Sequence, residues 1–371
     1  MEISLQKKLI FLFLFANASS VSGCGSFDYY LLKSISGLLN YQIDKNLQKE
    51  HEEHKLALTN CMKSGRIFNS SVPETKDFGS SFTISFADIQ KTHSWLYLPK
   101  FQNSMSSEIL MIVASRTDSF ARRNVLRKTW MNPENSEIIK DGRMKALFLV
   151  GMTDGDDSRM RKVVMEEARI YGDMVVVDLK DTYEELPFKS LTTLLYGTSK
   201  ASEFKLIGKI DEDIMFFPDK ILPLLEQNLI DPSSESIYGM LFAEGGYVYR
   251  DKEHRWFVPD STYGCDMFPP YTGGLFYLVT QDAAKKILNA TKHRIFIPIE
   301  DALINGILAN DCKIPRIHLP EIYGDHHSLT DEDTRGVLAW HTGKNDQQFL
   351  DYFYRKLSES RLKKKILDEK N

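Results

Sequence analysis

The sequence has 371 residues, of which 42% are hydrophobic and 26% are charged, a composition typical of an ordinary globular protein. A chain of this length can hold one large α/β domain plus an N-terminal extension. The net charge of −4 gives no reason to expect a nucleic acid or an anionic membrane surface as a partner.

The first 25 residues predict a targeting segment. Lys7 and Lys8 precede an apolar run, Leu9 to Ala16, that is shorter than the roughly 20 residues a membrane-spanning helix needs. The run suits a cleaved signal peptide, or a signal anchor over residues 9–25 behind a cytoplasmic tail of residues 1–8. Both interpretations place the rest of the chain in the secretory lumen. The third interpretation is a cytosolic protein with a buried N-terminal segment.

Three Asn-x-Ser/Thr sequons, at Asn17, Asn69 and Asn289, are compatible with a luminal protein. We predict glycosylation at Asn69 and Asn289, which lie beyond the targeting segment.

The four cysteines do not have the spacing of zinc ligands. In an oxidising lumen, Cys265 and Cys312 are candidates for a disulfide within the core domain. Cys24 and Cys61 lie outside that domain and are candidates for a disulfide between chains.

Residues 26–104 predict a luminal stem. The segment 44–55 is dense in charge, and the segment 68–82 is rich in Ser, Gly and Pro. We expect a helix around 32–58 followed by irregular chain, and a homodimer formed through the stem is a candidate assembly.

From Glu108 onward, strand and helix candidates alternate. Continuous apolar runs predict strands at 109–114, 146–150, 174–178 and 206–210. Helical spacing predicts helices at 119–130, 158–170 and 188–202. Beyond Pro218 we expect helices at 220–227, 281–289 and 301–309 and strands near 237–241 and 274–279. These units predict a mostly parallel sheet covered on both faces, in a domain at 105–355 that precedes a basic tail at 356–371.

Three carboxylates, Asp211, Glu212 and Asp213, follow the strand predicted at 206–210 and precede another apolar run. Unpaired charges near a core are unfavourable, so acids at this place should be paired or bind a metal. Ligand sites of open α/β sheets lie beyond the carboxyl ends of the strands, where Asp-x-Asp can hold a divalent cation and its phosphate ligands. The alternative is a solvated turn. No glycine-rich phosphate loop of the dinucleotide or P-loop type is present.

Three further features admit two interpretations each. Glu300 and Asp301 begin the helix predicted at 301–309, where they are either first-turn acids or a general base aimed at a hydroxyl group. Arg123 and Arg127 share one helical face, which is either a solvated face or a clamp for phosphate or for the active-site loop. For His341, spacing alone does not distinguish a ligand from a structural histidine.

Together these segments resemble the β1,3-galactosyltransferase family, which also includes β1,3-N-acetylglucosaminyltransferases and fringe enzymes. The resemblance covers about two-thirds of the chain, from Ile109 to Tyr352, and the motifs follow in the expected order. They are Arg123-x-x-x-Arg127-x-Thr-Trp130, Phe148-Leu-Val-Gly151, Tyr171-Gly-Asp173 with Asp178, Asp181, Tyr183, Leu186 and Lys189, Lys209-Ile-Asp-Glu-Asp213, Phe268-Pro-Pro-Tyr-Thr-Gly-Gly274 and Glu300-Asp301-Ala-x-x-x-Gly306. The chain departs from the pattern at Glu212, at Pro187-Phe188 and at Thr272, where the family often has cysteine.

The resemblance implies a Rossmann-like nucleotide-sugar transferase fold of the GT-A type, behind an N-terminal membrane anchor and stem. It implies a type II protein of the Golgi membrane with a luminal catalytic domain. The expected reaction is inverting transfer of galactose from UDP-galactose to the 3-hydroxyl of a sugar on a glycolipid or glycoprotein, with Mn²⁺. Transfer of N-acetylglucosamine within the same family is the alternative.

The resemblance also implies roles for single residues. The expected general base is Asp301 with Glu300 in support, and the expected metal ligands are Asp211, Asp213 and His341. The expected donor-binding residues are Arg123, Arg127, Lys189, Lys209 and Glu212. The expected acceptor-side loop contains Tyr271, Gly273 and Gly274.

Two alternatives come from other classes of protein. A phosphatase of the aspartyl-phosphate type also has Asp-x-Asp after a strand, but near the start of its domain and followed by Thr or Val two residues later. Here Ile214 comes next, and roughly a hundred core residues come first. A non-catalytic, metal-dependent sugar-binding module would not need Asp301.

Overall fold

The computed structural model describes residues 61, 63–69, 71–100, 107–152, 157–324 and 336–368, with side chains up to residue 362. The helices are α3 (Phe120–Lys128), α4 (Glu137–Lys140), α5 (Ser158–Tyr171), α6 (Leu186–Ser199), α7 (Ile221–Glu226), α8 (Gln281–Ala290), α9 (Ala309–Asp311) and α10 (Asp346–Asp368). Shorter helical turns are η1 (Pro133–Asn135), η2 (Tyr183–Glu185), η3 (Pro218–Lys220) and η4 (Thr291–His293), and η5 (Ala302–Leu308) is a π-helix.

The strands form a mixed ten-stranded sheet and two small sheets. The strands are β1 (Lys76–Asp77), β2 (Ser81–Ser85), β3 (Gln90–Tyr97), β4 (Ile109–Ser115), β5 (Met144–Gly151), β6 (Met174–Val177), β7 (Leu206–Asp211), β8 (Ile214–Phe216), β9 (Ile237–Phe242), β10 (Gly246–Tyr247), β11 (Met267–Phe268), β12 (Tyr271–Thr280), β13 (Arg316–His318), β14 (Ile322–Tyr323) and β15 (Ala339–His341). The large sheet has the order β1-β2-β3-β6-β5-β4-β7-β12-β9-β13.

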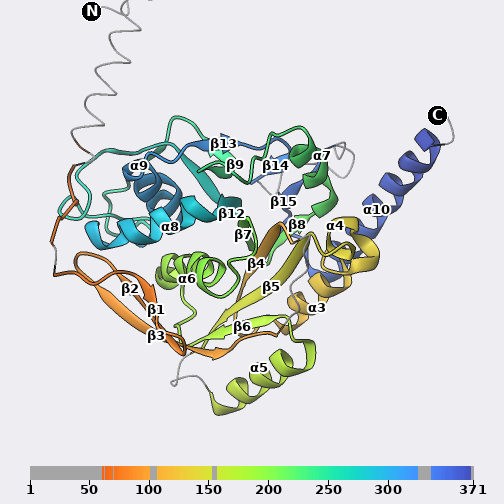
Figure 1. The fold of residues 1–371 in the computed structure, drawn as a ribbon, viewed down its shortest axis with the longest axis horizontal. Coiled ribbons are helices and arrows are strands. Elements are labelled where there is room, and N and C mark those ends of the chain that lie inside the picture. The colour runs from red at the N-terminus through yellow and green to blue at the C-terminus, as the bar shows by residue number, and fades with distance from the viewer. Residues whose placement is uncertain are drawn as a thin grey trace, which may run out of the picture. The chain divides into compact units, whose positions relative to one another are not determined.

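The centre of the large sheet, β6-β5-β4-β7, is parallel. The chain moves from β4 through β5 to β6, and then returns to β7 on the other side of β4. Right-handed crossovers therefore place α3, α4 and α5 on one face and α6 on the other, where α6 packs beside α8 (Figure 1). This reversal of direction makes the carboxyl ends of β4 and β7 a topological switch point.

The prediction of a mostly parallel sheet is only partly correct. The strands β3 and β12 flank the parallel centre and run antiparallel to β6 and β7. The α/β class is confirmed, since large apolar side chains fill the space between the sheet and its helices. The strands and helices predicted from residue 109 onward agree with the structure to within three residues at each end.

Part of the predicted stem belongs to the sheet. The strands β1, β2 and β3 lie within residues 76–97, and β3 pairs with β6 through Trp95 and Val177. In the sequence of β2, polar residues alternate with Phe82 and Ile84, which are buried. The prediction missed this strand because Ser and Gly residues are frequent around it. At the other end, α10 is continuous across the boundary predicted at 355/356.

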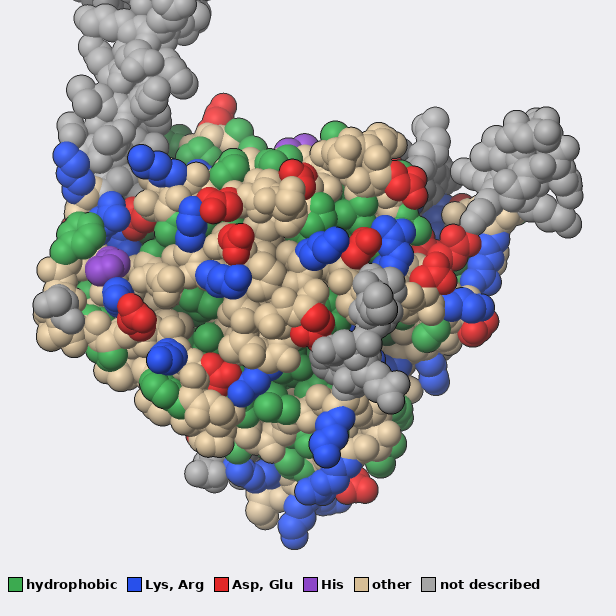
Figure 2. Space-filling model, viewed as in Figure 1, with side chains coloured by type: hydrophobic (Ala, Val, Ile, Leu, Met, Phe, Trp, Pro, Cys, Tyr) green, Lys and Arg blue, Asp and Glu red, His purple; other side chains and the backbone are tan. Residues whose placement is uncertain are grey.

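The tail, the anchor and the predicted stem helix, which end at about residue 58, lie outside the described residues. Within the described ranges, none of the helices is both long and apolar enough to cross a membrane. Figure 2 shows basic and acidic side chains interspersed over one face of the molecule, so neither sign of charge dominates that face.

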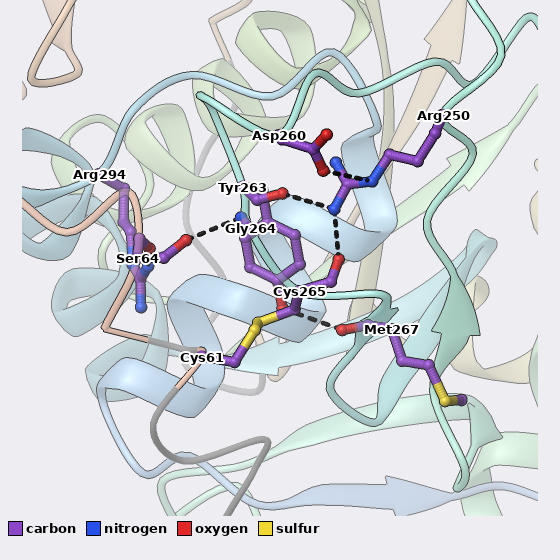
Figure 3. Close-up of a disulfide and its surroundings, with 9 residues drawn as sticks. All are labelled: Cys61, Ser64, Arg250, Asp260, Tyr263, Gly264, Cys265, Met267 and Arg294. Carbon is purple, nitrogen blue, oxygen red and sulfur yellow. Dashed lines mark hydrogen bonds and ion pairs between the residues drawn. A yellow bond between two sulfur atoms is a disulfide. The ribbon is translucent and has the colours of Figure 1, made fainter.

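The disulfide links Cys61 to Cys265, 204 residues apart in the sequence (Figure 3). The predicted pairing of Cys265 with Cys312 is therefore wrong, and Cys312 is a free thiol. The predicted pairing of Cys61 with Cys24 of another chain is wrong for the same reason. Local spacing gave no indication of this bond, because it is the path of the chain after β10 that brings Cys265 to Cys61.

Candidate active site

The acidic triplet lies at the switch point of the sheet. The adjacent strands β4 and β7 are in register, with Ala114 opposite Asp211. The loop 115–119 after β4 and the acids 211–213 after β7 therefore share one edge of the sheet. In open α/β sheets this edge is where ligands bind.

Glu212 joins these two loops. Its carboxylate accepts hydrogen bonds of 2.7 Å from the hydroxyl groups of Ser115 and Ser119. It also accepts one of 3.1 Å from the backbone N–H of Arg116, whose guanidinium forms an ion pair with it at 2.9 Å. These four contacts hold loop 115–119 against the acidic triplet. Contact of Glu212 with a nucleotide-sugar donor stays a prediction.

Of the two predicted donor-binding arginines, Arg123 lies inside the protein and Arg127 is partly buried. Arg123 is 0% exposed; it pairs with Glu167 at 2.7 Å and donates to the backbone carbonyl of Arg116 at 2.6 Å. Arg127 bridges Glu167 and Asp173 at 2.7 Å each. These bonds occupy both guanidinium groups, so the geometry does not support a phosphate clamp. For Arg123, which bonds to loop 115–119, it matches the other interpretation, a lock on the active-site loop. Arg127 instead links α3 to Glu167 on α5 and to Asp173.

Lys189 approaches the same loop from α6. Its ammonium group donates to the backbone carbonyl of Ser115 at 2.6 Å and to Asp181 at 2.8 Å. Asp181 in turn accepts a 2.7 Å hydrogen bond from the backbone N–H of Thr117. Lys189 therefore positions loop 115–119, from which the Arg116 side chain, 72% exposed, reaches solvent.

Asp213 and His341 are brought together by the small sheet. Because β15 runs antiparallel to β8 with His341 opposite Ile214, the imidazole Nε2 comes to 3.0 Å from Oδ2 of Asp213. Burial alone would raise the pKa of Asp213, but the hydrogen bond and charge of His341 outweigh it and hold that pKa below its usual value. The hydrogen bond to Asp213 raises the pKa of His341.

Asp211 lies beside a buried cation. Lys209 is 1% exposed, and its ammonium lies 2.7 Å from Asp211 and 3.7 Å from Glu300. Burial raises the pKa of Asp211 although Lys209 opposes that effect. Burial would lower the pKa of Lys209, but the charges of the two acids outweigh it and raise that pKa. Lys209 therefore stays charged and balances the acids around it.

Glu300 and Asp301 both line the cavity with Lys209 but have different environments. Glu300 is 6% exposed and accepts a 2.8 Å hydrogen bond from the Tyr277 hydroxyl, and burial raises its pKa to about 7. Asp301 is half-buried and accepts hydrogen bonds from the backbone N–H groups of Gly274 at 3.2 Å and Ala302 at 2.8 Å. Burial also raises the pKa of Asp301. Of the two acids, Asp301 is the one with room to meet a ligand.

Local backbone features hold this pair of acids in place. A Cβ atom on Gly274 would collide with a carboxylate oxygen of Glu300, so the close approach requires glycine. The helix after Asp301 is a π-helix, a form that is rare and frequently found at functional sites. The sequence predicted a helix here but not its type.

A cavity of about 690 Å³, within the size range of small-molecule sites, lies at this place, and neither Glu212 nor Asp213 is among its lining residues. The predicted site residues that line it are Lys209, Asp211, Gly273, Gly274, Glu300, Asp301 and His341. The lining also includes residues to which the sequence assigned no role in the site. Among them are Tyr183, which belongs to one of the motifs, and Met240, Phe242, Arg255, Trp256 and Tyr323. The only feature of the sequence that could have indicated Trp256 is its position next to Arg255 in a segment without helical or strand periodicity.

The remaining predicted residues lie at the margins. Tyr271 stacks on Phe242 with the ring centroids 5.1 Å apart, behind the cavity wall, and burial raises its pKa to about 12. Asn69 and Asn289 are both exposed, as attachment of a glycan requires. Asn17 lies outside the described residues.

The donor groups fit a divalent cation in their chemistry. Across the described residues, no three His, Cys, Asp or Glu side chains already form a closed ligand set. The 3.0 Å between His341 and Asp213 nevertheless matches two adjacent ligands of one ion, since ligands about 2.1 Å from an octahedral metal lie about 3 Å apart. Asp211, which now faces Lys209, would add a second carboxylate.

Comparison with known proteins shows the family to which the chain belongs. A family model described as Galactosyltransferase matches residues 121–320. The chain is 48% identical over 296 residues to beta-1,3-galactosyltransferase bre-2 of Caenorhabditis elegans, covering 79% of this chain and 82% of that protein. It is 28% identical to beta-1,3-galactosyltransferase 1 of Homo sapiens, over 57% of this chain and 64% of that protein. It is 24% identical to lactosylceramide 1,3-N-acetyl-beta-D-glucosaminyltransferase of Rattus norvegicus, over 64% of each chain.

Proposed function

Since this chain belongs to the galactosyltransferase family and is a glycosyltransferase, we propose that it transfers galactose from UDP-galactose to the 3-hydroxyl group of an acceptor sugar on a glycolipid or glycoprotein. The observation that carries the proposal is the half-buried carboxylate of Asp301 in a cavity that it shares with Asp211 and His341. The fold that we propose is of the GT-A type, and the switch point between β4 and β7 supports it. The phosphatase and the non-catalytic sugar-binding module are not supported.

The donor diphosphate is proposed to bind at the edge formed by loop 115–119 and the acids 211–213. Asp211, Asp213 and His341 are the residues that would hold Mn²⁺. When bound, the ion would neutralise the negative charge that develops on the leaving UDP. Arg116, which is exposed on the same loop, adds a positive charge at this edge.

Asp301 is proposed as the general base. Its carboxylate accepts the proton of the acceptor 3-hydroxyl while that oxygen attacks the anomeric carbon from the face opposite UDP. The bond between the anomeric carbon and the phosphate oxygen breaks, UDP leaves with the bonding electrons, and a single displacement inverts an α-linked donor to a β-linked product. The backbone N–H groups of Gly274 and Ala302 orient the carboxylate for this step.

Lys209 and Glu300 support this base. The Lys209 ammonium compensates the negative charge of Asp211, and the Tyr277 hydroxyl holds Glu300 in the interior. Glu300 is therefore proposed to position Lys209 and Gly274 rather than to touch the acceptor.

N-acetylglucosamine is the second candidate sugar for the donor. The similarity to the Rattus norvegicus lactosylceramide enzyme favours it, whereas the higher identity to the Caenorhabditis elegans galactosyltransferase favours galactose. The two donors differ at the 2-position of the sugar and in the configuration at C4. A pocket that hydrogen-bonds one of these groups can discriminate strongly against the other donor.

A transfer assay with the full chain in detergent tests the proposal. The chain would be incubated with UDP-galactose, UDP-N-acetylglucosamine or UDP-N-acetylgalactosamine and a panel of methyl glycosides, with Mn²⁺ or with a chelator. We expect galactose transfer that depends on Mn²⁺, and a β1→3 linkage by nuclear magnetic resonance of the product. An α-linked product would overturn the proposed inverting mechanism, and a different linkage position would overturn the proposed transfer to the 3-hydroxyl.

We also propose a type II protein of the Golgi membrane with the catalytic domain in the lumen, and this rests on the N-terminal sequence alone. Fractionation of cells expressing the full chain tests it. Recovery of a soluble, secreted chain cut near Ser22 would show a cleaved signal peptide instead.

A further inference from the structure

The segment 248–266, here called the aromatic arm, runs out from β10 and returns to β11. It carries large aromatic side chains at the surface, with Tyr249 39% exposed and Trp256 41% exposed. Tyr249 stacks on His254 with the ring centroids 3.7 Å apart. Exposed aromatic groups gathered in one segment are typical of binding sites.

The base of the arm is fixed in several ways, as Figure 3 shows. The disulfide joins Cys265 to Cys61. The Arg250 guanidinium donates to the backbone carbonyls of Tyr263 at 2.8 Å and Cys265 at 2.6 Å, and pairs with Asp260 at 3.0 Å. These bonds give the arm one defined shape, so its aromatic groups are preorganised for binding.

The tip of the arm reaches the loop before α6. The indole N–H of Trp256 donates to the Tyr183 hydroxyl at 2.8 Å, and the Arg255 guanidinium lies 3.9 Å from the centroid of the Tyr183 ring. All three residues line the cavity that also contains Lys209 and Asp301. The arm therefore forms a wall of the active site although it is remote from the site in sequence.

The cavity has two chemically different walls. Lys209, Asp211 and His341 form a charged wall, which suits a metal and a diphosphate. Tyr183, Arg255 and Trp256 form an aromatic wall with hydrogen-bond donors at its rim. A neutral pyranose presents one face of C–H groups and a rim of hydroxyl groups, and this chemistry matches the second wall.

We propose that the Tyr183–Arg255–Trp256 wall binds the acceptor saccharide, and this rests on the proposed function. One sugar ring of the acceptor stacks on the Trp256 indole, and its hydroxyl groups accept hydrogen bonds from Arg255. The hydrogen bond from Trp256 to Tyr183 fixes the plane of the indole. The arm thus selects the acceptor, whereas the sheet edge binds the donor.

Equilibrium binding tests the proposal without requiring turnover. Calorimetry on the full chain with Mn²⁺ and UDP would measure the affinity for N-acetyllactosamine and for methyl β-glycosides of galactose, N-acetylgalactosamine, N-acetylglucosamine and mannose. For the saccharide that wild type binds best, Trp256→Ala should weaken binding about 10- to 100-fold, the range for a lost pocket group. The affinity for UDP should change by less than about 2-fold.

Three further variants distinguish stacking from a general loss of structure. Trp256→Phe keeps a ring and should retain most of the affinity, while Tyr183→Phe removes the partner of the indole and should have an intermediate effect. Tyr247→Ala removes an aromatic group that is 74% exposed but does not line the cavity. It should change neither the saccharide affinity nor the UDP affinity.

Loss of UDP affinity in Trp256→Ala, with saccharide affinity kept, would overturn the inference and assign the arm to the donor. Unchanged saccharide affinity in both Trp256→Ala and Tyr183→Phe, or no binding of any saccharide to wild type, would overturn it as well. Failure of the proposed function would look different, because wild type would then bind saccharide with sensitivity to Trp256→Ala and yet transfer no sugar.

Discussion

The imidazole Nε2 of His341 lies 3.0 Å from Oδ2 of Asp213, although 128 residues separate them in the sequence. The contact arises because β15 pairs with β8, the strand that begins directly after Asp213. An imidazole nitrogen and a carboxylate oxygen at this separation are arranged as two neighbouring ligands of one metal ion would be. From this pair we derive the first prediction.

Alanine at Asp213 or at His341 should weaken Mn²⁺ binding about 10-fold or more, because each removes one of few protein ligands. Electron paramagnetic resonance titration of Mn²⁺ into the full chain with UDP measures this directly. His318→Ala is a matched control, since His318 lies on β13, outside the cavity lining. Unchanged Mn²⁺ affinity in both variants would show that the pair is structural.

Asp301→Asn should lower turnover about 10²–10⁴-fold, the usual contribution of a general base, while UDP affinity stays nearly unchanged. Glu300→Gln should lower turnover less, because Glu300 is bonded to Tyr277 in the interior. Turnover and calorimetry on the same two variants check this. Normal turnover in Asp301→Asn with an inactive Glu300→Gln would reverse the roles, and loss of UDP binding in both would refute the mechanism.

Glu300 should also make stability depend on pH. Burial raises its pKa to about 7, so the native state resists ionisation of this group and loses stability relative to the unfolded state as the pH rises from about 4.5 to 7. Glutamine cannot ionise, so Glu300→Gln should gain up to about 3 kcal/mol of stability relative to wild type between about pH 5 and pH 8. Urea unfolding of wild type and Glu300→Gln at about pH 5 and at about pH 8 measures this difference in the free energy of unfolding.

The exposed Glu166, with 63% of its side chain accessible, is the control for this effect. Glu166→Gln should change stability by less than about 0.5 kcal/mol, as is usual for an exposed position. A pH-independent difference for Glu300→Gln would mean that Glu300 ionises normally in the folded protein.

Arg123→Met should destabilise the fold by about 3 kcal/mol or more, because it removes one partner of a buried ion pair. Arg169→Met is the matched control: Arg169 is 63% exposed, so its loss should change stability by less than about 0.5 kcal/mol. Urea unfolding of both variants gives the comparison. If Arg123→Met instead kept full stability and lost UDP affinity, the phosphate clamp would be the correct interpretation.

The double substitution Cys61→Ser and Cys265→Ser should reduce stability by about 2–5 kcal/mol, the usual effect of removing a native disulfide. It should also weaken saccharide binding, because the disulfide anchors the aromatic arm. Cys312→Ser removes the free thiol and should do neither. Thermal unfolding with and without reductant checks the assignment: wild type should respond to reductant and the double variant should not.

Much of the fold followed from the sequence because the determining patterns are local. Continuous apolar runs identified β4, β5, β6 and β7, and the acids at Asp211 and Asp213 stood out because charge follows a buried strand. Glu300 and Asp301 were also recognisable in the sequence, as an acidic pair at the start of a predicted helix. In each case the neighbouring residues in the chain are enough to define the signal.

Tertiary structure decided what neighbouring residues do not define. The family resemblance implied a role for His341, but only the pairing of β15 with β8 places it beside Asp213. The burial of Arg123 required the approach of Glu167 on α5. Cys61 and Cys265 are bonded although they are 204 residues apart in the sequence. Trp256 lines the cavity of the candidate site because the segment 248–266 folds back onto Tyr183. Such contacts depend on packing between distant segments, which leaves no periodic pattern in the sequence for a local prediction to detect.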